Sequence, residues 1–379
     1  MSELTVQALL DDARREAGET ELGDESFLAP LSVLVEAMNT EARLTPAALE
    51  RQRREILDQL VNRLRMEAFF RRHPEISEQP VIAPVVIIGL QRTGTSKLFR
   101  VLGSDPQWNV LYTWQALYPV PFGTARADGP DPRLARAQAW VDSVKWMQAA
   151  HTFDVHAPEM EALLMMQCFM TNNPARLVPS HQRWCENADF RPLYRYLRRQ
   201  LQFLQWQNRS APGRRWMLKS PPHLLSLGAL AEVFPDSTFV MTYRHPKASV
   251  GSMLKLVEVA QQNNSTVVDR DLVRDQWLRI LSLSIRRFLE FRDAHPAHRI
   301  VDVRYRDVLA DSLGVVERIY AVAGARVTDD TRAAVAKWEV DNPQHKEGAF
   351  SYRLEDYGLT DADIEREFAG FIGRYGHLF

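Results

Sequence analysis

The chain has 379 residues, of which 45% are hydrophobic and 25% are charged, and its formal net charge is −1. A chain of this length can bury a large core, either as one α/β domain or as a domain with a smaller attachment. Because the charges nearly balance, the composition excludes a general attraction to nucleic acid or to an anionic membrane, and any anion-binding site must be local.

The N-terminus and the cysteines bear on the cellular location. Residues 1–18, MSELTVQALLDDARREAG, are charged and lack the apolar stretch of about 7–15 residues that a secretory signal needs. No apolar run approaches the ~20 residues that span a bilayer. Cys168 and Cys185 are too few for a disulfide framework and lack metal-ligand spacing. We therefore expect a cytoplasmic protein with no integral membrane segment and no nucleic-acid partner.

Residues 1–80 carry apolar side chains at three- and four-residue spacing, which is typical of amphipathic helices. The helical stretches are residues 5–18, 26–42 and 45–74. Pro74 and Pro80 mark the end of this pattern. The sequence therefore predicts a helical N-terminal attachment, for which a scaffold or a homodimer surface is favoured over a chemical role.

The character of the sequence changes at residue 81. The stretch VIAPVVIIGL, residues 81–90, has too few polar residues for a half-solvated strand and predicts the central strand of a parallel sheet. Further strands are expected at residues 109–114, 215–220, 237–244 and 298–305. The last three lead into helical patterns, so residues 81–379 are predicted to form an α/β domain with a doubly wound parallel sheet. Residues 121–214 are mainly helical and form an insertion in this domain.

The stretch GLQRTGTS, residues 89–96, follows the first strand and resembles a phosphate-binding loop, G-x-x-x-x-G-K-[ST], with Thr95 in place of the lysine. A helix predicted to start at the end of this loop would offer free backbone N–H groups to an anion. Arg92 adds a planar cation that can grip two oxygens, while Thr93, Thr95 and Ser96 add hydroxyl donors. The loop therefore predicts a phosphate-like ligand and a P-loop-like sheet.

The strand STFVMTYR carries a second cation. It ends in Arg244, where a nucleoside triphosphatase would carry an aspartate for magnesium. Ser252 follows eight residues later, about two turns into the next predicted helix, and can face the same anion. Since ligands of open α/β sheets bind beyond the carboxyl ends of the strands, this pair predicts a second anion site beside the loop. A P-loop kinase or NTPase is the alternative, and a nucleotide-binding protein without catalysis is a third.

The two segments GLQRTGTS and YRHPKASVGS together resemble the nucleotide-binding elements of sulfotransferases that use 3′-phosphoadenosine-5′-phosphosulfate (PAPS). WMLKSPPHL, residues 216–224, resembles the strand and turn between them, and NPQHKEGAFSYRLEDYGL, residues 342–359, resembles a segment of bacterial members. The resemblance covers about residues 84–358 and leaves the first 80 outside. It implies transfer of a sulfuryl group from PAPS to a hydroxyl, or an amine, of a small-molecule acceptor, without a metal.

The resemblance also implies roles for individual residues. The 5′-phosphosulfate would be bound by Gln91, Arg92, Thr93, Gly94, Thr95 and Ser96. Arg244 and Ser252 would bind the 3′-phosphate, and Lys346 would close over the nucleotide from a loop. Arg92, Lys219 and His223 are the expected catalytic residues, with His223 as the first candidate for the general base. Lys97 is expected to point to water rather than to the phosphosulfate.

Other positions could supply the base or the acceptor site. Gln115 stands where some relatives have a glutamate, and an amide cannot act as a base. The stretch AAHTFDVHAPEMEALL offers the alternatives His151, Asp154, His156, Glu159 and Glu161. Tryptophans between residues 106 and 210 could shape an apolar acceptor site, with residues 121–214 and the N-terminal attachment as its lid.

Overall fold

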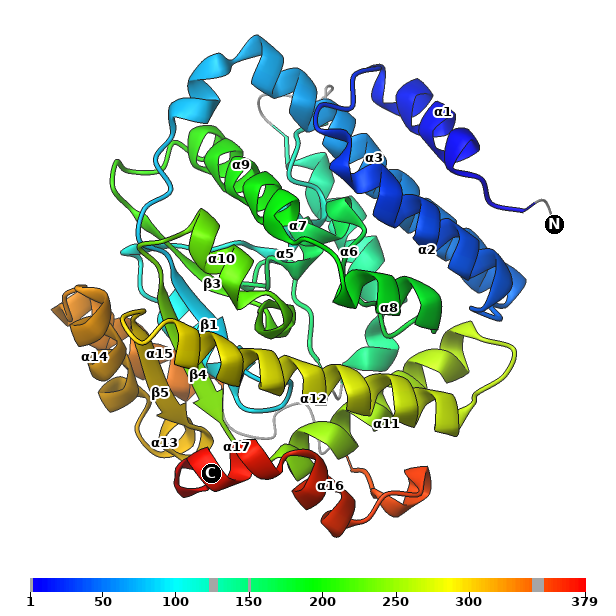
Figure 1. Ribbon diagram of the computed structural model, residues 1–379. Coiled ribbons are helices and arrows are strands. Elements are labelled where there is room, and N and C mark those ends of the chain that lie inside the picture. The colour runs from blue at the N-terminus through cyan, green and yellow to red at the C-terminus, as the bar shows by residue number, and fades with distance from the viewer. Residues whose placement is uncertain (1–2, 123–128, 149–150, 343–350) are drawn as a thin grey trace.

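The computed structural model describes residues 3–122, 129–148, 151–342 and 351–379. At its centre lies a five-stranded, entirely parallel sheet with the strand order β2-β3-β1-β4-β5 (Figure 1). The strands are β1 (Val85–Ile88), β2 (Trp108–Asn109), β3 (Arg215–Lys219), β4 (Thr238–Tyr243) and β5 (Ile300–Arg304). The strand predicted from VIAPVVIIGL is therefore the central one, and the predicted α/β fold is confirmed.

Both faces of the sheet are covered by helices, as a doubly wound sheet requires. Val86 and Ile88 of β1 belong to an apolar core shared with helices on one face, while Val85 and Ile87 belong to a second core on the other face. The helices of the first face are α9 (Arg191–Gln207), α10 (Leu227–Val233), α11 (Pro246–Asn264), α12 (Arg270–Ala294) and α17 (Ala369–Tyr375). Those of the second face are α4 (Thr95–Gly103), α13 (Tyr305–Ala310), α14 (Ser312–Ala323) and α15 (Asp329–Asp341).

The second predicted strand, residues 109–114, is shorter than expected and lies earlier in the chain. Beyond β2 the backbone leaves the sheet, because Leu111 accepts a hydrogen bond from the Glu159 N–H at 2.7 Å and the Thr113 N–H bonds to Ala157 at 3.1 Å. A short helix, α5 (Thr113–Leu117), then follows. The prediction of a strand was therefore wrong for residues 110–114, whose backbone partner is the segment at 157–159 and not a neighbouring strand.

The predicted N-terminal attachment consists of α1 (Val6–Ala17), α2 (Leu28–Thr40) and α3 (Pro46–Arg72). Helix α3 begins where the sequence provides a start signal, since Thr45 accepts the Ala48 N–H and Pro46 occupies the first turn. The three helices share an apolar core with Phe169 and Val178 of the insertion. The attachment therefore packs on the insertion, as Figure 1 shows for α2, α3 and α8 (Pro179–Glu186).

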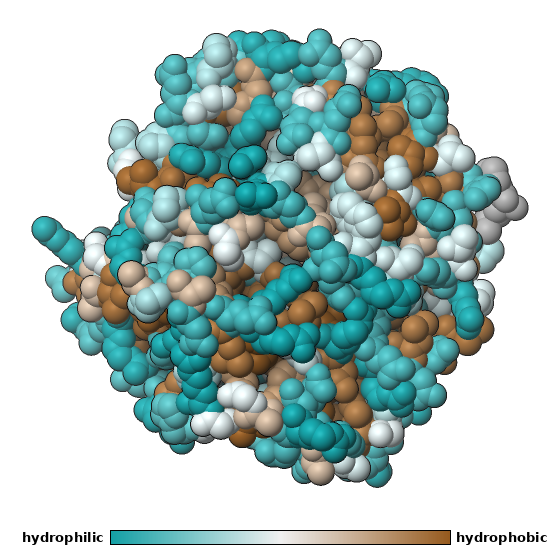
Figure 2. Space-filling view, viewed as in Figure 1, coloured by the Kyte–Doolittle hydropathy of each residue, from teal (hydrophilic) through white to brown (hydrophobic). Residues whose placement is uncertain are grey.

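The insertion and the C-terminus complete the helical layer. The remaining α-helices are α6 (Pro132–Ser143), α7 (Ala162–Met165), α8 (Pro179–Glu186) and α16 (Asp361–Glu367). The face seen in Figure 2 is mostly hydrophilic, with hydrophobic residues in patches between the polar ones. Within the described ranges, no helix is long and apolar enough to cross a membrane.

Candidate active site

A cavity of about 1130 Å³ opens beyond the carboxyl ends of the parallel strands. At this end it is lined by the last residue of β3 and by residues that come shortly after β1, β4 and β5: Gln91, Arg92, Gly94, Thr95, Ser96, Lys97, Lys219, Arg244 and Tyr305. This is the position at which open α/β sheets bind their ligands. The structure thus brings together most of the predicted anion-binding residues, although Gln91 and Arg244 are 153 positions apart in the chain.

The loop after β1 is held in a tightly wound conformation. Gly89, Arg92 and Gly94 have φ angles of 146°, 70° and 88°, in the region that favours glycine. A Cβ atom on Gly89 would lie 2.3 Å from Oγ1 of Thr242, and one on Gly94 would lie 2.7 Å from the Tyr305 ring. Both positions therefore require glycine, because a side chain would clash with these neighbours and because the backbone φ is positive. Arg92 adopts a left-handed backbone without being glycine, which is typical of functional loops.

Helix α4 starts at the end of this loop, with Gly94 as its N-cap and no side chain of the described residues capping it. The first intrahelical bond is donated by the Leu98 N–H to the Gly94 carbonyl at 3.0 Å. The N–H groups of the first turn are therefore directed at the cavity, where Thr95 and Ser96 line the wall. Such an N-terminus binds an anion well, so this part of the loop fits a phosphosulfate group.

Thr93 differs from the expectation. Its hydroxyl donates to the Leu90 carbonyl at 2.6 Å and lies 2.6 Å from Oγ1 of Thr242 on β4. Thr93 is buried and is not among the residues that line the cavity. The hydroxyl that was predicted to contact the ligand holds the loop against the neighbouring strand instead.

Arg92 and Arg244 lie side by side at the cavity. Nη1 of Arg244 donates to the Arg92 carbonyl at 2.9 Å, and its guanidinium lies 4.3 Å from the centre of the Tyr305 ring. Burial, and then the like charge of Arg244, lower the pKa of Arg92. Because each cation disfavours the other, an anion bound between them would be stabilised by both.

Ser252 lies on α11, as predicted, but it is buried and outside the cavity lining. The preceding residue, Gly251, packs closely on Tyr352. A Cβ atom at Gly251 would lie 2.3 Å from that ring. The segment that follows residue 350 thus covers α11 at this point. Lys346 lies outside the described residues, and Ser252 remains a prediction for the 3′-phosphate.

Lys219 ends β3 and points into the cavity beside a buried acid. Its Nζ is 3.9 Å from Oε1 of Glu159, and Nε2 of His151 is 2.9 Å from Oε2 of the same carboxylate. Burial would raise the pKa of Glu159, but His151 and Lys219 outweigh it and hold this pKa at about 2. Burial lowers the pKa of Lys219. Of these three residues, Lys219 and His151 line the cavity.

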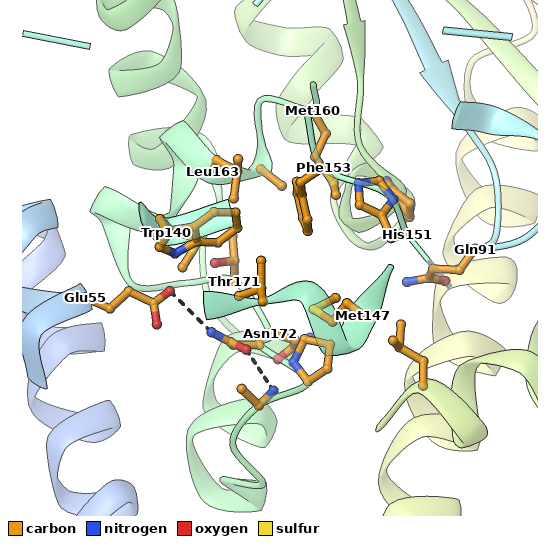
Figure 3. Close-up of a pocket in the computed structure, with 18 of the residues that line it drawn as sticks. Glu55, Gln91, Trp140, Met147, His151, Phe153, Met160, Leu163, Thr171 and Asn172 are labelled. Atoms are coloured by element: carbon orange, nitrogen blue, oxygen red, sulfur yellow. Dashed lines mark hydrogen bonds between the residues drawn. The ribbon is translucent and has the colours of Figure 1, made fainter. Parts of the chain in front are cut away.

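His151 has the geometry of a general base. When Nε2–H donates to Glu159, the tautomer leaves Nδ1 as an acceptor, and Nδ1 has no hydrogen-bond partner in the described part of the chain. The ring packs edge-on against Phe153 at 4.5 Å between centroids. Figure 3 shows His151, Phe153 and Gln91 on the same side of the cavity. Sequence reasoning had included His151 only as one alternative among five.

His223, the first candidate for the base, is completely buried and is not among the residues that line the cavity. Its Nε2 lies 2.5 Å from Oε1 of Glu161 and its Nδ1 lies 2.9 Å from the Tyr194 hydroxyl, so both ring nitrogens are occupied. The other oxygen of Glu161 accepts the Lys219 N–H at 2.8 Å. His223 therefore positions the end of β3 through Glu161, and this geometry does not bring it to an acceptor.

The remaining sequence candidates lie elsewhere. Gln115 and His156 line a separate cavity of about 760 Å³, where Nε2 of Gln115 donates to Asn208 at 3.1 Å. The carboxylate of Asp154 accepts the His156 N–H at 2.8 Å in an exposed turn. Lys97 does not point freely to water, since its Nζ is 3.0 Å from Oε2 of Glu339.

Most of the wall away from the loop was not foreseen residue by residue, although Trp140 and Trp146 fall among the tryptophans predicted between residues 106 and 210. Beyond His151 the cavity is lined by apolar side chains, which include Trp140, Trp146, Met147, Phe153, Met160, Leu163, Met166, Met253, Leu256 and Trp277. Its far end is formed by α3 of the N-terminal attachment and by residues 171–175 (Figure 3). Only the general signals, scattered tryptophans and an amphipathic helix, pointed to this wall in the sequence.

A glycine loop between the central strand and a helix, with a second cation at the end of the adjacent strand, is the arrangement of a P-loop-like α/β protein. A sequence model of the sulfotransferase family matches residues 84–329. The chain belongs to the sulfotransferase family. It is therefore an enzyme that transfers sulfuryl groups, for which PAPS is the standard donor, and the kinase alternative is set aside.

Individual relatives agree with this assignment. The structure of sulfotransferase STF9 from Mycobacterium avium matches with a TM-score of 0.86 and 27% identity over 98% of this chain and 96% of that one. STF1 from Mycobacterium tuberculosis H37Rv matches with a TM-score of 0.82 and 28% identity over 97% and 99%. Omega-hydroxy-beta-dihydromenaquinone-9 sulfotransferase Stf3 from Mycobacterium bovis is 22% identical over 312 residues, 78% of this chain and 75% of its own.

The structural matches correct one expectation. The resemblance seen in the sequence left out the first 80 residues, but a match over 97% of the chain necessarily includes most of them. The N-terminal helices are thus a shared part of these sulfotransferases.

Proposed function

We propose that this sulfotransferase transfers the sulfuryl group of PAPS to a terminal hydroxyl of an elongated, largely apolar small molecule. The observation that carries the proposal is that one cavity connects the anion-binding loop and His151 to a long apolar wall. A nucleotide alone does not need that wall. Apolar lining with a few convergent polar groups is typical of small-molecule sites.

The donor is assigned to the loop end of the cavity. Gln91, Arg92, Gly94 and the first turn of α4 with Thr95 and Ser96 bind the 5′-phosphosulfate, and Arg244 binds the 3′-phosphate. Two adjacent arginines and an uncapped helix N-terminus support this assignment, because each contributes charge-assisted hydrogen bonds to an anion. Ser252 and Lys346 belong to the same proposal.

The chemistry needs a base and a stabilised leaving group. Nδ1 of His151 accepts the proton of the acceptor hydroxyl, and Glu159 keeps the ring in the required tautomer and stabilises the imidazolium. The acceptor oxygen attacks sulfur while the bond from sulfur to the bridging oxygen breaks. Arg92 and Lys219, which both line the cavity, stabilise the charge that develops on that oxygen. His151 thus takes the proton on the acceptor side of the transferred sulfuryl group, and Arg92 and Lys219 stabilise the negative charge on its leaving-group side.

Two observations support this class of acceptor: the name of a curated relative and the apolar wall of the cavity. The curated relative Stf3 is named for an omega-hydroxylated dihydromenaquinone. The apolar wall of this cavity suits an acceptor of the same general kind, with a hydroxyl at the end of an apolar body. Tryptophan and methionine side chains supply large contact areas for such a body.

The N-terminal attachment is assigned to the acceptor site, because α3 supplies its far wall. A boundary at residue 80 consequently separates a lid from a catalytic domain rather than two independent units. The homodimer and the cytoplasmic location remain predictions, which size-exclusion chromatography with light scattering and cell fractionation test.

Calorimetric titration with 3′-phosphoadenosine-5′-phosphate (PAP) beside ATP with magnesium tests the donor. We expect PAP to bind and magnesium-ATP not to bind. Arg92→Ala and Arg244→Ala should each weaken PAP binding by ~1.5–3 kcal/mol, because each removes a charged hydrogen-bond donor, while Arg286→Ala, an exposed arginine on α12, should not. Affinities like the wild type in both site variants, or a preference for magnesium-ATP, would sink the assignment.

A further inference from the structure

The far end of the cavity is polar, although the middle is apolar. Three carboxylates and three arginines line it: Glu50, Glu55, Asp58, Arg51, Arg54 and Arg136. Equal numbers of opposite charges give this end no net charge. This balance favours a neutral ligand group over an ion, whose own charge would lack compensation.

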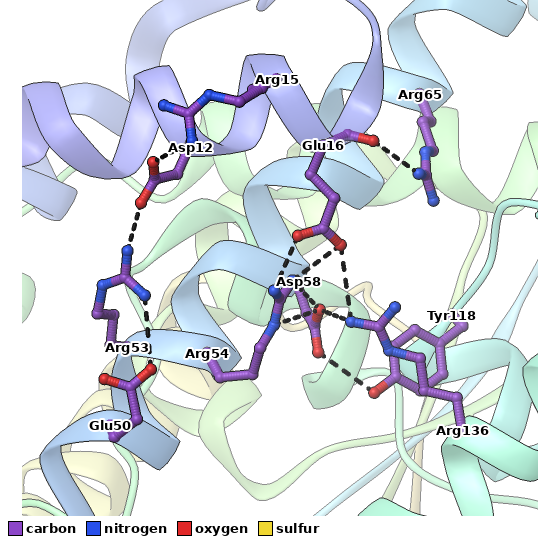
Figure 4. A network of polar contacts seen from close by, with 10 residues as sticks. All are labelled: Asp12, Arg15, Glu16, Glu50, Arg53, Arg54, Asp58, Arg65, Tyr118 and Arg136. Carbon is purple, nitrogen blue, oxygen red and sulfur yellow. Dashed lines mark hydrogen bonds and ion pairs between the residues drawn. The ribbon is translucent and has the colours of Figure 1, made fainter.

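The arginines at this end are already engaged by protein groups. Arg54 pairs with Glu16 at 2.8 Å and with Asp58 at 2.5 Å, and Arg136 also pairs with Asp58 (Figure 4). Arg51 donates to Oδ1 of Asn264 at 3.1 Å. These contacts tie α3 to α1, α6 and α11. Since these arginines are already paired with protein groups, we infer that they hold the helices together and do not bind the ligand.

Glu55 differs from its neighbours. No cation of the described residues lies within ion-pair distance of its carboxylate, whose recorded hydrogen bond comes from Nδ2 of Asn173 at 3.4 Å. Asn173 is itself fixed, because its Oδ1 accepts the Ala175 N–H at 2.8 Å. Burial raises the pKa of Glu55 and Asp58 adds to this, while Arg176 and a hydrogen bond from the Gln52 side chain oppose it. The carboxylate thus lines the cavity with two amide partners and with room for a further donor.

Three further polar groups converge on the same place. Thr171 and Asn172 line the cavity, and their side chains have no hydrogen-bond partner in the parts of the chain that the structure describes. Gln52, one helical turn before Glu55 on α3, lines it too and has a buried Oε1 without a partner. Thr171 and Asn172 are partly buried, whereas Gln52 is buried and its Oε1 lacks the partner that buried polar groups normally have, so a ligand that reaches this end can complete the set. Figure 3 shows Glu55 at the opposite end of the cavity from Gln91 and His151.

We propose that Glu55, Thr171 and Asn172 form a second polar subsite, which binds a neutral hydroxyl at the unreactive end of the acceptor. The acceptor then has a hydroxyl at each end of an apolar body. One hydroxyl is sulfated at His151; the other donates to the Glu55 carboxylate and accepts from the Asn172 amide. This inference rests on the proposed function, and it sets both the length and the polarity of the substrate.

The test uses matched probes, namely 1-alkanols and α,ω-alkanediols of equal chain length from eight to sixteen carbons, titrated into enzyme saturated with PAP. For the best length, we expect the wild type to bind the diol about tenfold more tightly than the alkanol, the size of one hydrogen bond to a charged group. Glu55→Met, which keeps the volume but not the acceptor, should abolish this preference. Glu55→Gln should restore part of it, because its amide oxygen still accepts.

The control variant is Glu50→Met, which removes a neighbouring carboxylate that is 71% exposed and paired with Arg53, and should leave the preference unchanged. In turnover with PAPS, Glu55→Met should raise KM for the diol without lowering kcat. Equal affinities for alkanol and diol in the wild type, or binding of neither, overturn the subsite even if PAP binds normally. Failure of PAP itself to bind would instead overturn the proposed function.

Discussion

The two ends of the cavity differ in which atoms they present to a ligand. The loop end offers backbone N–H groups of a helix N-terminus, with Arg92 and Arg244 beside them. The far end offers side chains alone, from α3 and from the segment 171–175. A backbone cradle depends on a few glycines at fixed spacing, whereas a wall of side chains depends on how distant helices pack. The first kind of site is therefore tied to the donor that a family shares, and the second kind can vary with the acceptor.

This difference implies that variants at the two ends should affect different measurements. Changes near the loop and His151 should alter the reaction with every acceptor. Changes on α3 should alter only which acceptor is bound. The predictions below separate these two outcomes.

The largest effect is expected at His151. Its replacement in His151→Ala removes the proton acceptor, so kcat should fall by about 10²–10⁴-fold, the usual contribution of general base catalysis. The affinity for PAP, measured by calorimetry, should stay within about twofold, because His151 is not assigned to the donor. His156→Ala is the matched control, since His156 lies in the same segment but lines the separate cavity. A variant at His151 with normal turnover would exclude it as the base.

The next effect concerns the carboxylate behind His151. Glu159 has a pKa of about 2 in the folded protein against an ordinary value of 4.5, so its ionised form stabilises the fold above pH 4.5. Glu159→Gln should lower the free energy of unfolding at pH 7 by ~3 kcal/mol. The difference from the wild type should shrink as the pH falls from 4.5 towards 2, as the advantage of ionisation is lost.

Urea unfolding at pH 7, 4 and 3 measures this difference. The control is Glu290→Gln on the exposed face of α12, whose effect should be small and independent of pH. A penalty for Glu159→Gln that stays constant down to pH 3 would mean that ionisation of this carboxylate does not stabilise the fold.

His223 offers a smaller and different effect. Because its ring nitrogens face Glu161 and Tyr194, the variant His223→Gln should lower the free energy of unfolding by ~1–3 kcal/mol through unpaired buried groups. The acid limb of the pH profile of kcat, which reports deprotonation of the base, should keep its pKa. Loss of that limb with unchanged stability would return the base role to His223.

Much of the fold was predictable, because its signals are local. The apolar run VVII and the helical periodicity of residues 45–74 each depend on neighbours in the sequence. The loop at residues 89–96 was also predictable, because its glycines and hydroxyl residues lie close together in the sequence. The general base could not be chosen from the sequence, because both His151 and His223 were candidates. Only the structure shows that His223 is buried away from the cavity and that His151 lines it. The contact between Thr93 and Thr242 could not be predicted, because nothing in the sequence shows that the two residues are neighbours.

The smallest expected effect lies in the ion network of the far end. Arg53 pairs with Asp12 and, at 3.5 Å, with Glu50, and its side chain is one third exposed. Arg53→Ala should cost only ~0.2–1 kcal/mol of unfolding free energy, and less in 1 M salt, because exposed pairs are screened. The same variant should leave KM for alkanediols unchanged, since the arginines here hold α3 in place and Glu55 recognises the ligand. A raised KM for the diol with unchanged stability would instead extend the acceptor subsite along α3 to Arg53.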